Sequence, residues 1–161
     1  MLKEIGYQRD TTLEYARQWA MGRNPQYYDF EKLGGDCTNF ASQCVLAGSG
    51  VMNHTPIMGW YYNSSVSRSP SWTGVTYFYN FLLNNKSVGP YGVETEMKDA
   101  QPGDIVQFGN RKGFYHSPVI VSTEGEHILV AAHSYDAYMR RLDSYEFECV
   151  RFLHIQGVRK W

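Results

Sequence analysis

The first half of the chain carries apolar residues at helical spacing. Leu13, Ala16 and Trp19 recur every three residues and form one apolar stripe, which is typical of an amphipathic helix. Thr11 and Glu14 stand three residues apart at its start, in the pattern of a capping box. We therefore expect a first helix that begins at Thr11 and buries one face.

Two more helices are predicted by the apolar pattern, over residues 37–48 and residues 74–83. Residues 49–74 lie between them and are rich in glycine, serine, asparagine, proline and tryptophan, without a helical or strand period. A long irregular segment inside a compact domain is commonly functional or disordered, and its tryptophans argue against disorder. We call residues 49–74 the aromatic insert.

The second half of the chain changes to short runs rich in valine and isoleucine, which predict strands. These runs cover residues 103–108, 116–122, 127–133 and 148–155. Helices followed by strands indicate an α+β fold in which helices pack on an antiparallel sheet. The length of 161 residues suits one domain spanning residues 1–161.

One cysteine stands where a helix is expected to begin. Cys37 follows Gly34, Gly35 and Asp36, and Asp36 is a favourable N-cap residue. Free N–H groups and the positive end of the helix dipole favour a thiolate in the first turn, so Cys37 is a candidate nucleophile with a lowered pKa. The alternative is a small buried residue that only packs, as free cysteines often do.

Two of the five histidines are candidates for a base and its partner. The predicted strands 116–122 and 127–133 are joined around residues 124–125, and a loop of two or four residues there places His116 directly opposite His133. One imidazole could then accept the thiol proton while the other holds its second ring nitrogen.

The composition of the chain argues against some classes of binding partner. The net charge is −1 and no basic block occurs, which argues against nucleic acid and anionic membranes as main partners. No apolar run is long enough to span a bilayer, and we expect no signal peptide at the start of this chain, which suits an excised domain or a phage-type lysin. Thirteen tyrosines and four tryptophans suit a wet groove that holds a polar polymer, although many of them are expected in the core.

The three cysteines predict neither a disulfide framework nor a structural zinc site, because no CxxC pair is present. A zinc amidase that uses Cys37, His116 and His133 is disfavoured by their spacing and by the lack of a placed catalytic carboxylate. We expect no metal and no cofactor.

Several segments together resemble the papain-like bacterial cell-wall hydrolases, a superfamily that includes the NlpC-type peptidases and the CHAP amidases. The resemblance is greatest to its "putative amidase domain" branch and covers nearly the whole chain. The segments that carry it are Asn24-Pro25, Tyr27–Phe30, Gly34–Phe40, Ser42-Gln43, Gln101–Phe108, His116–Val121 and Ala132–Asp136.

The resemblance implies a papain-like fold, with a helix-borne cysteine facing a small antiparallel sheet. Cys37 matches the family's nucleophile and His116, at the head of a strand, matches its base. The third position in this superfamily is a His, Asn, Gln or acid on the next strand, which His133 matches. Asp136, three residues further on, could orient a histidine instead.

The residue expected in the oxyanion hole differs from that of papain, which has a glutamine six residues before its cysteine. Glu31 occupies that position here and cannot donate when ionised. NlpC-type peptidases tend to use a tyrosine from the preceding loop, and Tyr27 or Tyr28 could take that role. The backbone N–H of Cys37 would be the other donor.

The activity implied by the resemblance is thiol-dependent cleavage of amide bonds in peptidoglycan, outside the cytoplasm, through a thioester and by a monomer. In this arrangement the aromatic insert could form one wall of the substrate groove, with candidate contacts from Trp60, Tyr61, Tyr62 and Trp72. The alternatives are an acyltransferase that uses the same triad and a non-catalytic wall-binding module. The bond cleaved stays open, as does the choice between a host autolysin, a phage lysin and a toxin domain.

Overall fold

The computed structural model describes all 161 residues and has the α+β class that the sequence predicts. Helices and strands follow one another in the order β1 (Lys3–Ile5), α1 (Arg9–Trp19), α2 (Cys37–Ser49), β2 (Tyr62–Ser64), β3 (Ser67–Arg68), α3 (Pro70–Thr73), α4 (Val75–Asn84), β4 (Gly89–Thr95), β5 (Ile105–Asn110), β6 (Gly113–His116), β7 (Val119–Ser122), β8 (Leu129–Ala132), β9 (Ala137–Arg141) and β10 (Cys149–Lys160). Two 3₁₀ turns cover Met97–Asp99 and Leu142–Ser144.

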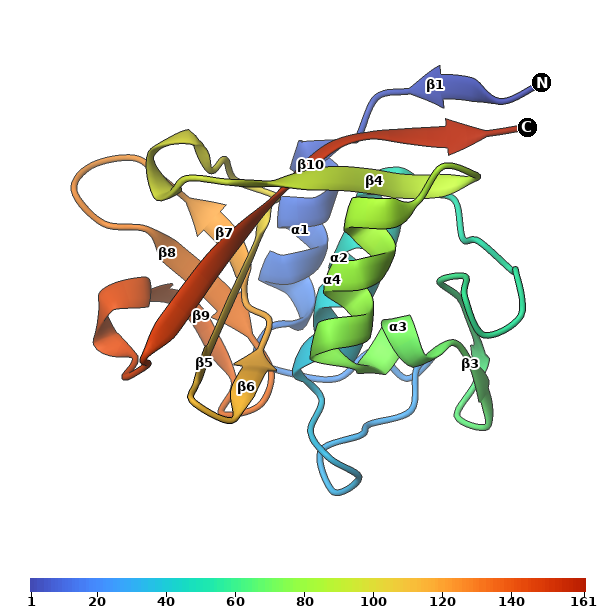
Figure 1. Cartoon of the computed structure of the whole chain (residues 1–161). Coiled ribbons are helices and arrows are strands. Elements are labelled where there is room, and N and C mark those ends of the chain that lie inside the picture. The colour runs from blue at the N-terminus through green and yellow to red at the C-terminus, as the bar shows by residue number, and fades with distance from the viewer.

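One curled antiparallel sheet holds eight strands in the order β1-β10-β5-β7-β8-β9, with β4 also paired to β10 and β6 to β5. The long strand β10 pairs with β5 through its first half and with β4 and β1 further along. Figure 1 shows the three longer helices side by side against this sheet, and the chain termini next to each other where β1 meets β10. None of the helices combines the length and apolar character needed to cross a bilayer.

Helix α2 lies at the centre of the larger apolar core. Ten of its thirteen residues are buried, because α1 and α3 pack against it and the sheet lies on a further side. Its apolar residues Phe40, Ala41, Cys44 and Val45 are fully buried in this core. Gly50 ends the helix with a φ of 69°, a left-handed conformation that glycine adopts without a Cβ clash. The predicted helix 37–48 is therefore confirmed.

The predicted bounds of the first helix are wrong by two residues. Helix α1 begins at Arg9, after Gln8, so Thr11 lies inside the first turn and cannot form the predicted capping box with Glu14. Glu14 pairs with Arg17 instead, one turn along the exposed face. The third predicted helix, 74–83, corresponds to α4 within one residue.

Two tryptophans of the aromatic insert are core residues. Trp60 and Trp72 have no exposed surface, and their rings lie 4.8 Å apart between centroids. The Trp60 indole donates to Ser42 Oγ and the Trp72 indole donates to Asn39 Oδ1, so both polar tips end on α2. The prediction that these two side chains contact substrate is wrong, since the core of this small domain takes up their large apolar surface.

The segment Pro102-Gly103-Asp104 leads into β5 and ends in a buried carboxylate. Asp104 is fully buried, and Arg9 on α1 and His154 on β10 each lie 2.9 Å from it. It also accepts bonds from the backbone N–H groups of Gln101 and Ile155. Asp104 thus joins the first helix to two neighbouring strands, and His154 has a structural role as its partner.

Candidate active site

The thiol of Cys37 lies against the strand segment that ends at His116. Cys37 is the first residue of α2, and its Sγ is 3.7 Å from the carbonyl oxygen of Tyr115, the residue before His116. Because the two segments are 78 residues apart in the chain, the fold alone brings the thiol to the backbone beside His116. The Cys37 thiol and the His116 ring form no direct hydrogen bond in this resting arrangement, and apo sites commonly tighten only with substrate.

The turn before Cys37 requires two glycines. Gly34 and Gly35 have φ values of 95° and 105°, which side chains with a Cβ rarely adopt. A Cβ on Gly35 would also stand 3.4 Å from Ser134 Oγ. The chain reverses here and delivers Cys37 to the start of α2.

Asp36 does not cap the helix as predicted. Its carboxylate accepts bonds from the Phe30 N–H and from Asn39, and lies 2.6 Å from His133 Nδ1, so no side-chain bond to the first N–H groups of α2 is made. The hydrogen bond from His133 and those from Asn39 and Phe30 outweigh burial and hold the pKa of Asp36 below its usual value. The uncapped N–H groups at the start of α2 remain able to bind a developing oxyanion.

His133 does not hold the His116 ring, so the predicted pairing of the two histidines is wrong. Its Nδ1 contacts Asp36 and its Nε2 lies 2.9 Å from the carbonyl oxygen of Trp19. Strand β7 pairs with β8 as Val119↔Ala131, one residue away from the predicted register. A shift of one residue turns a side chain to the opposite face of a sheet. His116 moreover ends β6, which pairs with β5.

Aromatic rings surround His116 in place of a polar partner. Its imidazole stands edge-on to Phe108, with centroids 5.1 Å apart, and 5.8 Å from the Tyr145 ring. Burial, with a smaller contribution from the positive charge of Arg140, lowers the pKa of His116 to about 4. His116 is therefore neutral near pH 7, which is the form that accepts a proton.

The pKa of Cys37 moves in the direction opposite to the sequence-based expectation. Burial raises it, and the negative charge of Asp36 acts in the same direction. The hydroxyl of Thr38 and backbone N–H groups of Ser117 and Thr38 oppose this rise without cancelling it. Thiol and imidazole are therefore both uncharged near pH 7, and a thiolate forms only when a base takes the thiol proton.

The remaining candidates fall into three places. Tyr27, Tyr28 and Tyr62 line one surface depression, and the Tyr28 carbonyl accepts a bond from Asn39 on the first turn of α2. Tyr61 lies outside that depression and stacks on His54. Asp136 pairs with Arg23 at 2.8 Å and contacts no histidine.

Two groups of residues around the site are not singled out by the sequence pattern. Arg23 lies between four carboxylates, those of Asp29, Glu31, Asp36 and Asp136. Thr38, Ser117 and Gln107 form a buried polar row that reaches Cys37. A glutamine between the apolar Val106 and Phe108 of one strand is the sequence signal that could have revealed the second group.

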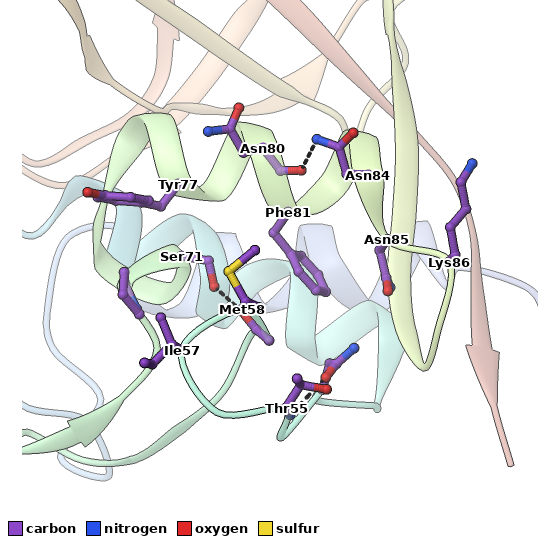
Figure 2. Close-up of a pocket in the computed structure, with 13 residues that line it drawn as sticks. Thr55, Ile57, Met58, Ser71, Tyr77, Asn80, Phe81, Asn84, Asn85 and Lys86 are labelled. Atoms are coloured by element: carbon purple, nitrogen blue, oxygen red, sulfur yellow. Dashed lines mark hydrogen bonds between the residues drawn. The ribbon is translucent and has the colours of Figure 1, made fainter.

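A second hollow lies elsewhere on the molecule, between α4 and residues 55–59. It has a volume of ≈ 500 Å³, and none of the residues that line it is a candidate site residue. Figure 2 shows Phe81 reaching into it from α4 while Ile57 and Met58 border it on the opposite side. The structure also contains no group of three or more His, Cys, Asp or Glu side chains arranged to hold a metal ion.

Comparison with known proteins identifies the class. The model of the family described as "Putative amidase domain" matches residues 6–155, and the chain belongs to this family. The family description points to hydrolysis of amide bonds.

A curated relative is the uncharacterized protein YhbB of Bacillus subtilis (strain 168). It is 34% identical over 140 residues, which are 83% of this chain and 43% of the relative. The chain thus spans less than half the length of this relative. No solved structure matches the chain.

Proposed function

We propose that this domain is a papain-like cysteine amidase or peptidase, in which Cys37 is the nucleophile and His116 the base. The observation that carries the proposal is the contact between Cys37 Sγ and the backbone beside His116, 3.7 Å from the Tyr115 carbonyl oxygen. The family description, which points to amide hydrolysis, supports the reaction type.

The reaction follows from two neutral groups. Neutral His116 takes the thiol proton as Sγ attacks the amide carbonyl carbon, and the protonated ring then gives that proton to the leaving amine. The C–N bond breaks and a thioester remains on Cys37. Water, deprotonated by His116, attacks the thioester and releases the carboxylic acid and the thiol.

The oxyanion of each tetrahedral intermediate would bind at the start of α2. The backbone N–H of Cys37 is one proposed donor, because the first N–H groups of a helix have no partner inside it. Tyr27 and Tyr28 are proposed for the second donor, and the bond between Asn39 and the Tyr28 carbonyl, 2.9 Å long, keeps their loop beside the first turn.

We further propose that the substrate is a stem-peptide or muramoyl-peptide amide of peptidoglycan, cleaved outside the cytoplasm by a monomer. The depression lined by Tyr27, Tyr28 and Tyr62 supports this, because tyrosine pairs an apolar ring with a polar tip and suits a polar polymer. The NlpC-type and CHAP hydrolases, which the site motifs resemble, provide the same expectation.

Purified sacculi provide the test, with mass analysis of the released fragments. Cys37→Ser should abolish fragment release, whereas the matched control Cys44→Ser should retain it, because Cys44 is buried in the core away from the site. Iodoacetamide should inhibit and EDTA should not. Release by the Cys37 variant would disprove the nucleophile, and new amine or alcohol adducts on the fragments would indicate acyl transfer.

A further inference from the structure

The hydroxyl of Thr38 has two acceptors within reach and only one proton. Its Oγ1 donates to Ser117 Oγ at 3.3 Å and lies 3.7 Å from Cys37 Sγ. The Thr38 side chain is buried, so water does not compete for it. The bond to Ser117 is longer than the 2.7–2.8 Å usual between hydroxyl groups, so little free energy is lost when it is exchanged.

Ser117 keeps a hydrogen bond when Thr38 turns away. Gln107 Nε2 donates to Ser117 Oγ at 3.0 Å, and both residues are buried. The orientation of the Gln107 amide is determined by Arg151, whose guanidinium donates to Gln107 Oε1 through Nε and Nη2 at 2.9 and 2.7 Å. With its oxygen occupied in this way, the amide presents N–H to Ser117.

Arg151 is itself held in place between two rings. Its guanidinium carbon stands 3.5 Å from the Tyr79 ring centroid and 3.8 Å from that of Phe114. Arg151 thus donates to Gln107 and Gln107 donates to Ser117, while Thr38 donates to the same Ser117 oxygen from the side of Cys37.

We infer that Thr38 is a positioning residue that turns its hydroxyl proton from Ser117 to the Cys37 thiolate when the thiol ionises. In the thiol state the S–H group donates to the Tyr115 carbonyl and Thr38 donates to Ser117. When His116 has taken the proton, Thr38 donates to the sulfur, and Gln107 alone satisfies Ser117. The inference rests on the proposed function, since it assigns Thr38 to the nucleophile of that reaction.

Other groups near the sulfur do not replace this hydroxyl. Asp36 is negative and raises the pKa of Cys37, while His116 is neutral near pH 7. Thr38 supplies the side-chain hydrogen bond that lowers this pKa, beside backbone N–H groups that no substitution removes. Hydrogen bonds to charged groups are the stronger ones, which gives this hydroxyl leverage on the thiolate.

The test measures how fast iodoacetamide alkylates Cys37 as a function of pH, with the Cys37 peptide quantified by mass spectrometry. Thr38→Val keeps the shape of the side chain without the hydroxyl and should raise the thiol pKa by about one unit, which slows alkylation at pH 7 about tenfold. Thr38→Ser restores the hydroxyl and should restore the rate. An unchanged alkylation profile in Thr38→Val would overturn the inference.

Ser117→Ala provides a second variant, in which the pKa of the Cys37 thiol should not rise. It removes the acceptor of the thiol state, so Thr38 is left to donate to sulfur and the thiol pKa should stay or fall. Local disruption of packing would instead move both variants in the same direction, and a rise in Ser117→Ala would refute the exchange even if Thr38→Val failed to fold. The alkylation assay needs no substrate, so its outcome is separate from that of Cys37→Ser on sacculi, which tests the proposed function.

Discussion

The protonation of His116 makes the sharpest prediction for the proposed site. The residue is 8% exposed and its imidazole lies among aromatic rings, and burial lowers its pKa to about 4 from an ordinary value near 6.5. The unfolded chain therefore binds a proton at this residue at a higher pH than the folded chain does. The free energy of unfolding contributed by neutral His116 is fully present above pH 6.5 and is lost as the pH falls from 6.5 to 4.

The size of the effect follows from the shift. A difference of about 2.5 pKa units corresponds to about 3 kcal/mol at 1.36 kcal/mol per unit. Urea denaturation of the wild type and of His116→Gln, at several pH values between 7 and 4, isolates this contribution, because all other carboxyl and imidazole groups are shared. The wild type should lose about 3 kcal/mol more than the variant over this range.

The same protonation should limit catalysis. If neutral His116 accepts the thiol proton, kcat/KM for fragment release should fall below pH 4 to 5, on the acid side of an ordinary histidine. If the free energy of unfolding falls equally with pH in the wild type and in His116→Gln, the conclusion that His116 is buried as a neutral imidazole is wrong. An acid limb near pH 6.5 would show that His116 is exposed or paired in the working enzyme.

Four further predictions test the remaining assignments. Trp60→Ala should cost about 3–5 kcal/mol in urea denaturation, because its fully buried ring leaves a cavity, and an unchanged stability would contradict the core role given to this ring. Asp104→Asn should cost about 3 kcal/mol, since Arg9 loses a buried partner, and a loss near zero would contradict the structural role given to this carboxylate. Tyr62→Ala should raise KM on sacculi more than Tyr61→Ala does, and equal effects would argue against the tyrosine depression as part of the groove. Cys44→Ala should lower the melting temperature slightly and leave Cys37 alkylation unchanged, whereas slower alkylation would mean that the core around α2 controls the thiol.

The spacing of apolar residues along the chain was sufficient to predict the helices in which these residues recur regularly. Phe40, Ala41 and Cys44 recur on one face, so the start of α2 at Cys37 and its end near Gly48 follow from the sequence. The same holds for α4 and for the α+β order of helices and strands. The strands β1 and β6 carry too few residues for their period to stand out, and β4 and β9 lack the runs of valine and isoleucine that mark the predicted strands.

Strand register and burial were decided by the tertiary structure. The predicted hairpin of strands 116–122 and 127–133 placed His116 opposite His133. In the structure His116 ends β6, which pairs with β5, and β7 pairs with β8 one residue away from the predicted register. Because side chains alternate between sheet faces, this single shift directs His133 to Asp36 and leaves His116 among aromatic rings. Neither outcome can be read from spacing alone.

The sequence by itself determined which residues are candidates for the chemistry, because a cysteine after Gly-Gly-Asp and a histidine before a strand stand out as residue types. The tertiary structure alone decided their protonation states and partners. The pKa of Cys37 depends on how much of the sulfur is desolvated and on where Thr38 and Asp36 lie, and the role of Trp60 depends on the core around it. Desolvation and hydrogen bonding between distant segments are properties of packing, which a linear pattern does not contain.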